Sequence, residues 1–569
     1  FFAKGYGYAD LDRQIPVDPA RTLFRVGSVS KLYTWTAVMQ LVEQGRLDLD
    51  TDVNEYLDFA IPATFEQPIT LRHLLTHTPG FEDNALGLFV LHENEVTPFE
   101  EDISQNIPTR VFPPGEISAY SNYGAALAGY IVQRVSGVPF DRYVEQNIFQ
   151  PLSMAHSSFR QPLPADLAGD MSVGYRDAGG ELLPGGFEYV VPYPAGSLSS
   201  SALDQAAFMI AHLQDGQLGE ARILQAETAR QMHSLQYAYD DRLDGWGLGF
   251  AVSAAGAEPS FGHGGDTTFF HSEMLLLPEA NVGVFISTNT DTGSTPRSQF
   301  LQAFLERYFP ASAPAAGTAD LLPPDPAVQG VYYPTRMSFT RVEKVLSLVA
   351  PVNVAVTPDN RLQVTGLIGP EPTYWAQIEP GLFVPLGGPL PAEARLMIED
   401  RTVGGETRPY LLIGSLSFAR QPWYAASSLA ILLVSLAAFL VAFVAFPVTG
   451  WLGPRYARLA GASARPAEPA LTRLARWVGW ALALLGLLFW MVFAVFSGDI
   501  YNLVFGLPPV LQAALWIPWI FLGLAVAAAG LSLWLWLRRA WTLPGRIGYT
   551  LLVLAALVQV WLLAFWNFL

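Results

Sequence analysis

The stretch FRVGSVSK, residues 24–31, decides the fold of the N-terminal half of the chain. Beyond it, apolar residues recur at the spacing of one helix face: Leu32, Trp35, Met39 and Val42. Gly45 then follows as a stop signal. The sequence therefore predicts a helix over residues 28–44, with Ser28 and Lys31 in its first turn. Three residues make nearly one helical turn, so both side chains project from one face.

Lysine is rare in this chain, which makes Lys31 informative. The other lysines are Lys4 and Lys344, and almost every other basic residue is arginine. An arginine stays protonated, whereas a lysine amine can lose its proton when it is partly buried. A serine hydroxyl becomes a nucleophile when a neighbour takes its proton. The spacing alone fits two solvated surface residues equally well, but the scarcity of lysine favours Ser28 as a nucleophile with Lys31 as its base.

Two further motifs follow along the chain. The first is YSN at residues 120–122, where Asn122 is expected to cap a helix that ends before Gly137. The second is GHGGD at residues 262–266, ahead of predicted strands over 273–277 and 282–287. Paired glycines let a substrate backbone approach closely. Taken singly, a core tyrosine with a helix cap and an ordinary turn would explain these motifs, so the prediction rests on all three together.

The order S-x-x-K, Y-x-N and a basic residue with glycine on a strand resembles the serine β-lactamase and penicillin-binding-protein superfamily. Within it, the chain is most similar to the class C-like branch of β-lactamases, D-amino-acid peptidases and family VIII esterases. Further segments carry the resemblance: VMQLVEQGRLDL at 38–49, ITLRHLLTHTPG at 69–80 and IFQPLSM at 148–154. It covers residues 1–310 and implies an α/β (α+β) catalytic domain, an antiparallel sheet flanked by helices.

The resemblance implies a role for each residue of the first two motifs. Ser28 would be the acylated nucleophile, and Lys31 and Tyr120 would share the general-base and general-acid work. Asn122 would hold the substrate or the lysine. Residues 81–112 are expected to overhang the site. Members usually carry another strand and helix before the segment seen at residue 1, so we expect the natural chain to begin earlier, with any export signal.

The third motif would bind the substrate through His263, Gly264, Gly265 and Asp266. The oxyanion hole would be formed by the backbone N–H groups of Ser28 and Asp266. Relatives that act on antibiotics or cell-wall peptides mostly carry Lys at the position of His263. A fixed cation suits a substrate carboxylate, whereas an imidazole with a reference pKa of ~6.5 is mostly neutral at pH 7. This favours a peptidase, amidase or esterase and predicts poor turnover of β-lactams.

The rest of the chain divides by composition. Residues 311–325 are rich in Ala and Pro and predict a linker. Residues 326–421 predict a small all-β domain, because short alternating runs are separated by turn residues: 352–356, 361–364, 382–384 and 410–413. This region contains no chemical motif.

Four uncharged apolar stretches in residues 425–569 predict membrane-spanning helices: about 425–446, 477–496, 510–537 and 547–569. The first connection between them carries Arg455, Arg458, Arg465, Arg473 and Arg476, and the third carries Arg538, Arg539 and Arg546. The second carries Asp499 and no basic residue. The positive-inside rule places connections one and three in the cytoplasm. Residues 1–424 and the C-terminus should then lie outside it.

Charge and residue types exclude several functions. The formal net charge of the 569 residues is -17, yet residues 425–569 hold eight Arg against Glu468 and Asp499, so the first 424 residues carry -23. This argues against nucleic-acid binding. The absence of cysteine excludes disulfides and thiolate metal sites. His73 and His77 have the spacing of a metal pair on a helix, but no third ligand is evident, so we predict no metal and no cofactor.

The sequence thus predicts a membrane-anchored serine hydrolase that acts outside the cytoplasm on a small-molecule or peptide substrate. The alternatives are a β-lactamase or a D-Ala-D-Ala-type penicillin-binding peptidase, and then a non-catalytic penicillin-type sensor. A sensor needs a cytoplasmic output, and the inner connections of about 30 and 10 residues contain no domain. A charged residue within the membrane is the usual mark of a transport path. The four apolar stretches carry none and are interpreted as an anchor in the lipid bilayer.

Overall fold

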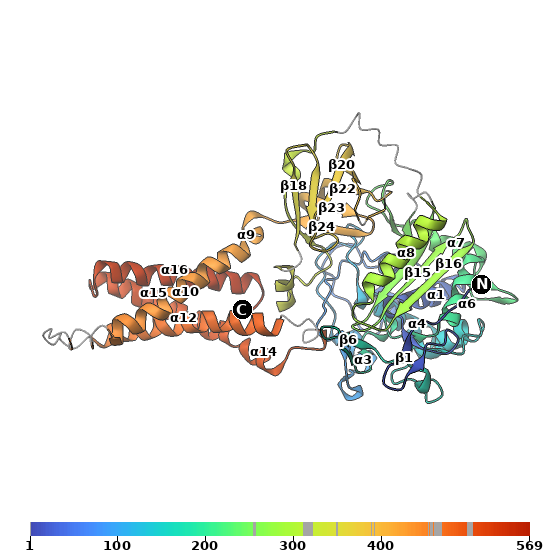
Figure 1. The fold of residues 1–569 in the computed structure, drawn as a ribbon, viewed down its shortest axis with the longest axis horizontal. Helices are drawn as coiled ribbons and strands as arrows, with labels where there is room; N and C mark the ends of the chain where they lie inside the picture. The colour runs from blue at the N-terminus through green and yellow to red at the C-terminus, as the bar shows by residue number, and fades with distance from the viewer. Residues whose placement is uncertain are drawn as a thin grey trace. The chain divides into compact units, whose positions relative to one another are not determined.

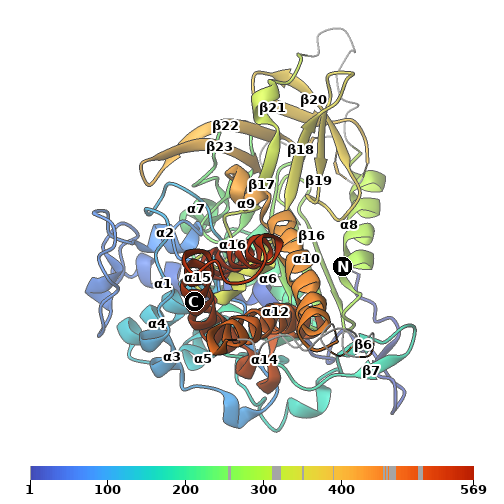
Figure 2. The same ribbon diagram turned by 90° about the vertical axis from the view of Figure 1, so that its left-hand side faces the viewer.

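The computed structural model describes residues 2–253, 258–310, 322–348, 351–388, 390–391, 393–452, 455, 459, 469–497 and 504–569. The chain forms two compact units, drawn in Figures 1 and 2. The first combines Phe1–Met337 with Ala350–Arg420, and the second combines Ser338–Val349 with Gln421–Leu569. Most of the predicted linker, residues 311–321, lies outside the described residues.

An antiparallel sheet of five strands lies in the first unit, in the order β12-β13-β14-β15-β16. Its strands are β12 (Gly245–Trp246), β13 (Ala251–Ser253), β14 (Ser260–Asp266), β15 (His271–Leu277) and β16 (Val282–Thr288). The two predicted strands lie within β15 and β16, which pair with Leu277 opposite Val282. Helix α8 (Ser294–Tyr308) lies along these two strands in Figure 1. Helix α6 (Ala202–Leu213) also packs against both.

The helix predicted over residues 28–44 is present, but it begins later than predicted. A 3₁₀ turn, η1 (Gly27–Val29), precedes α1 (Ser30–Glu43). Gly27 has a φ of 55°, a conformation that glycine adopts far more readily than other residues. The Ser30 hydroxyl donates a hydrogen bond to the Gly27 carbonyl and closes the turn. The serine of the S-x-x-K motif therefore sits just ahead of the helix, in a tight turn.

The helix expected to begin at Asn122 is α4 (Asn122–Ser136), which packs against α1. Its N-cap is Ser121, whose Oγ accepts the N–H of Gly124 at 2.9 Å. The prediction that Asn122 caps the helix was therefore wrong, because the hydroxyl one residue earlier does so. This leaves the Asn122 amide available to the site. The helix ends as predicted at Gly137, which has a left-handed φ of 77°.

The other elements of this region are short. The helices are α2 (Leu71–Leu75), α3 (Phe99–Gln105), α5 (Phe140–Val144) and α7 (Ala226–His233). Paired strands are β1 (Tyr8–Asp10) with β2 (Ile15–Pro16), β4 (Phe89–Val90) with β8 (Tyr189–Val190), β6 (Tyr175–Asp177) with β7 (Leu182–Pro184), and β10 (Gln217–Leu218) with β11 (Ala221–Arg222). The strand β9 (Ser199–Ser200) lies between β3 (Phe24–Arg25) and β5 (Ser157–Ser158). A mixed fold of helices around antiparallel sheet is confirmed.

The predicted all-β region is a closed barrel of eight strands. These are β17 (Gly330–Pro334), β18 (Val352–Val356), β19 (Leu362–Thr365), β20 (Thr373–Glu379), β21 (Leu382–Pro385), β22 (Leu396–Val403), β23 (Glu406–Ile413) and β24 (Leu416–Arg420). The four predicted runs fall in β18, β19, β21 and β23. Alternate side chains point inward, and Tyr332, Val354, Trp375 and Leu411 are among those that form the core.

The barrel packs against the sheet-containing part of the same unit. Figure 2 shows β22 and β23 as a long hairpin. From this hairpin, Arg401 Nη1 donates to the Tyr239 carbonyl at 3.2 Å, and the N–H of Gly404 donates to Glu116 Oε2 at 2.8 Å. Glu116 belongs to the segment that leads to Tyr120. The barrel therefore supports one wall of the region where the predicted motifs meet.

Among the described residues of the second unit, four helices are long and apolar enough to cross a membrane: Ser428–Gly450, Ala470–Phe496, Pro509–Leu537 and Leu543–Phe565. They are formed by α10 (Ser428–Pro447), α12 (Ala470–Ser497), α14 (Pro509–Ala514) with α15 (Ile517–Leu537), and α16 (Leu543–Phe565). The short helix α9 (Trp423–Ala426) precedes them. Figure 1 shows α10, α12, α15 and α16 packed side by side. Arg458, Arg465 and Asp499, which contribute to the predicted orientation, lie outside the described residues.

Candidate active site

Lys31 lies at the centre of the candidate site and is fully buried. Its Nζ contacts three oxygens: Ser28 Oγ at 2.9 Å, Asn122 Oδ1 at 2.8 Å and the Ala195 carbonyl at 2.7 Å. The turn η1, helix α4 and the turn η6 (Tyr193–Ala195) thus converge on the amine that α1 carries. The oxygens of Asn122 and Ala195 can only accept hydrogen bonds. They fix the orientation of the amine and leave its third position for Ser28.

The neutral form of Lys31 is favoured by its surroundings. Burial, and then the positive charge of Arg336, hold the pKa of the Lys31 amine well below its usual value, whereas Asp83 acts in the opposite direction. A neutral amine has two N–H donors and one lone pair. Since Asn122 and Ala195 take the donors, the lone pair faces the Ser28 hydroxyl. This geometry suits proton transfer from Ser28 to Lys31.

Tyr120 lies beside this pair, with its ring in contact with three groups. The His77 ring stacks on it with centroids 4.1 Å apart, the Arg336 guanidinium carbon lies 4.4 Å from its centroid, and Lys31 Nζ lies 4.9 Å away. Burial raises the pKa of the phenol above its usual value, while Arg336 and the nearby Ser28 hydroxyl lower it. Tyr120 is therefore protonated at neutral pH. Its buried hydroxyl has no hydrogen-bond partner among the described residues, Ser28 included.

His263, on β14, faces the same region, and its ring centroid lies 5.9 Å from that of Tyr120. Burial, and then the Lys31 amine in its protonated form, lower the pKa of the imidazole to about 4. His263 is therefore neutral at pH 7. Its Nδ1 contacts the Gly264 carbonyl, which only accepts, so Nδ1 carries the proton. Nε2 is then an acceptor, and it is buried without a partner in the described part of the chain.

The backbone of β14 and the backbone of the turn η1 lie very close to each other at the place where the oxyanion hole was predicted. A Cβ at Gly265 would lie 2.0 Å from the Val26 carbonyl oxygen and 2.9 Å from the Ser28 nitrogen. A Cβ at Gly27 would lie 2.6 Å from the Asp266 nitrogen. Only glycine permits this approach from both sides. The amides of Ser28 and Asp266 are consequently brought into one neighbourhood, as a two-donor anion site requires.

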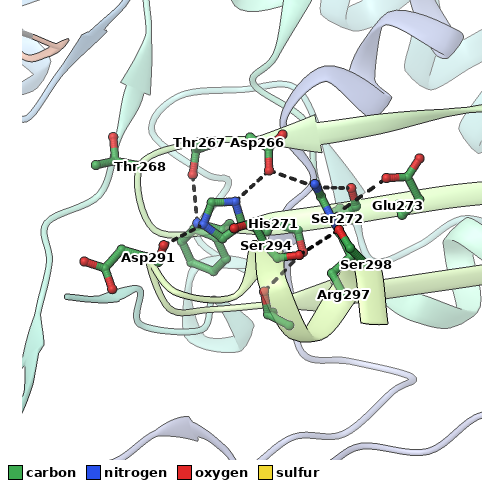
Figure 3. A network of polar contacts seen from close by, with 12 residues as sticks. Asp266, Thr267, Thr268, His271, Ser272, Glu273, Asp291, Ser294, Arg297 and Ser298 are labelled. Carbon is green, nitrogen blue, oxygen red and sulfur yellow. Dashed lines mark hydrogen bonds and ion pairs between the residues drawn. The ribbon is translucent and has the colours of Figure 1, made fainter. Parts of the chain in front are cut away.

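The Asp266 side chain takes part in a separate network, shown in Figure 3. Its Oδ1 lies 2.6 Å from His271 Nδ1 and 2.8 Å from Arg297 Nη1. Arg297 Nη1 also donates to the Ser272 carbonyl at 2.9 Å. Burial alone would raise the pKa of the Asp266 carboxyl, but His271 and Arg297 hold it below its usual value. The network anchors the end of β14, so the backbone amide of Asp266, not its carboxylate, suits the predicted contact with substrate.

The structure also places Gly264 and the two histidines that were considered as a metal pair. Gly264 faces Glu273 on β15, since a Cβ there would lie 2.9 Å from Glu273 Oε2. His77 is not on the helix that carries His73, because α2 ends at Leu75 and His77 has a φ of 53°. His73 Nδ1 instead accepts the N–H of Thr70 at 3.2 Å. Within the described residues, no group of three or more His, Cys, Asp or Glu side chains could hold a metal ion.

Sequence reasoning missed three residues that contact or surround Tyr120. His77 stands in a segment quoted for its family resemblance, so that resemblance could have indicated a role for it. Asp83 lies in the stretch expected to overhang the site. Nothing in the sequence around Arg336 indicates that it belongs to the site, because it follows the first strand of the barrel, far along the chain from Tyr120.

Comparison with known proteins agrees with this fold. The beta-lactamase family matches residues 1–305. Penicillin-binding protein 4 of Amycolatopsis lactamdurans is 29% identical over 305 residues, which cover 50% of this chain and 76% of that protein. PbpX of Bacillus subtilis (strain 168) is 34% identical over 226 residues, which cover 38% of this chain and 52% of PbpX. The chain thus spans about half the length of PbpX.

Among solved structures, SurE is similar in fold, with a TM-score of 0.52 at 22% identity over 73% of this chain and 91% of that chain. At this identity the likeness concerns the fold alone. The family match is more informative, because it takes in more than half of the chain, including Ser28, Lys31 and Tyr120. The protein therefore belongs to the beta-lactamase family, whose members are serine hydrolases.

Proposed function

We propose that this protein is a membrane-anchored serine hydrolase that cleaves amide or ester bonds through an acyl-Ser28 intermediate. The observation that carries the proposal is the contact of 2.9 Å between Lys31 Nζ and Ser28 Oγ in a buried site. The other two contacts of this amine are to oxygens that only accept. Of these three neighbours, only Ser28 can give a hydrogen bond to the lone pair of a neutral Lys31.

In the proposed reaction, Lys31 takes the proton of Ser28 as Oγ bonds to the substrate carbonyl carbon. The carbonyl electron pair moves to its oxygen, beside the N–H groups of Ser28 and Asp266. When this pair returns, the bond to the leaving amine or alcohol breaks. Tyr120 gives its proton to the leaving group and regains one from Lys31. Its raised pKa keeps the phenol protonated at neutral pH, so the proton for this transfer is present. Water then attacks the acyl-serine by the reverse sequence of proton transfers.

The proposed substrate class is an amide, peptide or ester. His263 supports it, because a neutral imidazole stands where antibiotic-acting relatives mostly carry a cation. The alternative is a β-lactamase or a D-Ala-D-Ala-type peptidase, which the names of penicillin-binding relatives favour. A non-catalytic sensor is the third candidate. It would form the acyl-enzyme without releasing product.

A panel of substrates separates these candidates. The purified full chain is tested with D- and L-aminoacyl amides, short acyl esters and a chromogenic β-lactam, with Ser28→Ala as the control. The proposal expects steady turnover of an amide or ester that Ser28→Ala abolishes. Fast β-lactam hydrolysis would support the first alternative. A single burst of acylation with no turnover of any member would support the sensor.

The location is part of the proposal. Four helices are long and apolar enough to cross a membrane, and penicillin-binding-type domains usually act outside the cytoplasm. We therefore place the hydrolase domain and the barrel on the extracytoplasmic side of the cell membrane, with the four helices in the lipid bilayer. The arginine-rich first and third connections support this orientation.

A further inference from the structure

Arg336 comes from the barrel, two residues after β17 ends, yet it lies against the proposed acid of the active site. Its guanidinium carbon is 4.4 Å from the centroid of the Tyr120 ring. Its Nε donates to Asp83 Oδ2 at 2.7 Å, and the N–H of Asp83 donates to the Met337 carbonyl at 3.2 Å. A loop of the hydrolase domain and the exit of the first barrel strand are thus joined twice beside Tyr120.

Hydrogen bonds between the barrel and the segment before Tyr120 hold Arg336 close to the Tyr120 ring. The Ser118 carbonyl, two residues before Tyr120, accepts from Thr335 Oγ1 at 3.1 Å and from Ser417 Oγ at 3.2 Å. Both hydroxyls belong to the barrel, and both are buried. Ser118 is also held from the hydrolase side, where its N–H donates to the Tyr239 hydroxyl at 2.9 Å. The position of the Arg336 backbone relative to Tyr120 is therefore set by buried hydrogen bonds.

The charged and titratable groups around Lys31 and Tyr120 come from several elements: His77 after α2, Asp83 in the following loop, His263 and Asp266 on β14, and Arg336 after β17. Burial lowers the pKa of both His77 and His263, so they are neutral at pH 7. Asp266 is engaged by His271 and Arg297. Among the described residues, Arg336 and Asp83 are the charged groups that shift the pKa of Lys31, and they act in opposite directions.

We infer that Arg336 and Asp83 form a charge pair, completed by the barrel, that sets how readily the Ser28–Lys31–Tyr120 centre reacts. Arg336 favours the unprotonated Lys31 that can activate Ser28, and Asp83 opposes it. Both are positioning residues, since they act through Lys31 and Tyr120. The inference deepens the proposed function and rests on it. It also gives the barrel a part in the chemistry, through its first strand.

The directions of the two pH shifts distinguish this role from that of a structural clasp, meaning an ion pair that only holds the two segments together. Arg336→Gln and Asp83→Asn break the same ion pair, so a clasp predicts similar defects. A charge pair predicts opposite shifts in the pH at which Lys31 becomes active. The Arg336 side chain is 47% exposed, so water screens its charge. A shift of about half a pH unit to one unit is expected for each variant.

The test measures how fast a neutral fluorophosphonate labels Ser28 in the full chain, from acid to alkaline pH. In this reaction Oγ bonds to phosphorus, the P–F bond breaks with loss of fluoride, and Lys31 takes the serine proton. Arg336→Gln should move the midpoint of the rate profile to higher pH, because loss of the positive charge lets Lys31 hold its proton. Labelling below the midpoint should slow by about 3-fold to 10-fold.

Asp83→Asn should move the midpoint to lower pH, because Arg336 is then unopposed. Arg336→Lys keeps the charge and should keep the wild-type midpoint, and the double variant of Arg336→Gln with Asp83→Asn should return near it. Arg336→Met serves as a second neutral variant if Arg336→Gln does not fold. Thermal unfolding of each variant verifies the fold.

Shifts in the same direction, or unchanged midpoints in both folded variants, would overturn the inference and leave Arg336 and Asp83 as a structural clasp. An unchanged midpoint with slower hydrolysis only of substrates that bear a carboxylate would also overturn it and make Arg336 a substrate-binding residue. Wild-type protein that is not labelled at Ser28 at any pH would instead refute the proposed function, and with it this inference.

Discussion

At the scale of single residues, Lys31 is the most constrained group of the site. Its amine contacts one hydroxyl and two oxygens that only accept hydrogen bonds. Replacement by another cation cannot preserve this pattern, because a guanidinium is larger, carries five donors and does not lose its proton. The chemistry proposed for Ser28 therefore requires lysine, and charge alone does not suffice.

Lys31→Arg should reduce hydrolysis to near the level of Ser28→Ala. Hydrolysis of the best amide or ester of the substrate panel measures the effect. Lys344→Arg is the matched control, because it makes the same exchange at the membrane-helix unit, where Lys344 lies over the Phe565 ring, and it should keep full activity. A Lys31→Arg variant that works at the wild-type rate would refute the role of Lys31 as base.

Tyr120→Phe should lower turnover by about 10²-fold to 10⁴-fold, the usual contribution of general acid–base help. The ring and its stack on His77 remain, so stability should change little. Tyr130→Phe is the control, since it also removes one hydroxyl, which donates to Asp58 at 2.8 Å. Steady-state kinetics of the two variants measure the loss of turnover that the removal of each hydroxyl causes. Equal, small effects would contradict a role for Tyr120 as acid.

At the scale of elements, the approach of β14 to the turn η1 builds the proposed oxyanion hole. Gly265→Ala would place a Cβ 2.0 Å from the Val26 carbonyl oxygen, so the strand and the turn must separate. We expect a loss of stability of about 1–3 kcal/mol, as for overpacking, and a large loss of activity. Gly169→Ala is the control, since a Cβ there meets no atom within 4 Å. Denaturant unfolding with activity measurements tests both; a fully active Gly265→Ala would contradict the assignment.

Helices α6 and α7 bring two imidazoles together, His212 buried and His233 partly buried, with His212 Nδ1 and His233 Nε2 2.9 Å apart. Burial lowers the pKa of His212 to about 3 and that of His233 well below its usual value. Below pH 6.5 the unfolded chain therefore binds protons that the folded chain does not. The free energy of unfolding should fall as pH drops from about 6.5 toward 4, and His212 should contribute about 2 kcal/mol of this loss at pH 5.

Denaturant unfolding at pH 7 and pH 5 measures this loss. A His212→Gln variant should lose less stability than the wild type between the two pH values, because one of the titrating groups is gone. His92→Gln, at an exposed position, should lose as much as the wild type. An identical loss in His212→Gln and the wild type would show that His212 does not contribute to the pH dependence.

Elements that depend on local pattern could be predicted from the sequence. The helix after Ser28, the strands that became β15 and β16, and the four apolar helices all follow from periodicity and length. The boundary errors were local. The helix began at Ser30 because Gly27 forms a tight turn, and the cap was Ser121 because its hydroxyl reaches the Gly124 amide.

The features of the site that could not be predicted from the sequence depend on contacts between segments that are far apart along the chain. His77 was expected on a helix but instead stacks on Tyr120. Arg336 lies after the linker and in a region without any motif, so nothing in its surroundings along the chain indicates a contact with Tyr120. Closure of the barrel and its packing on the hydrolase domain create that contact, and neither can be derived from periodicity.

At the scale of the whole molecule, the proposed orientation in the membrane rests on loop arginines alone. The chain has no cysteine, so single introduced cysteines report accessibility cleanly. A cysteine near Asp499 should react with an impermeant maleimide in intact cells, and one near Arg465 should react only after the cells are opened. The reverse pattern would place the active site in the cytoplasm and contradict the proposed export.

The central claim is that Ser28 forms a covalent acyl-type intermediate. The most direct test is the mass of the full chain after reaction with a fluorophosphonate, followed by identification of the modified residue. The account predicts one adduct, located on Ser28, that is absent from Ser28→Ala and still present in Ser298→Ala, an unrelated serine on α8. An adduct that persists in Ser28→Ala, or no adduct on the folded wild-type protein, would contradict it.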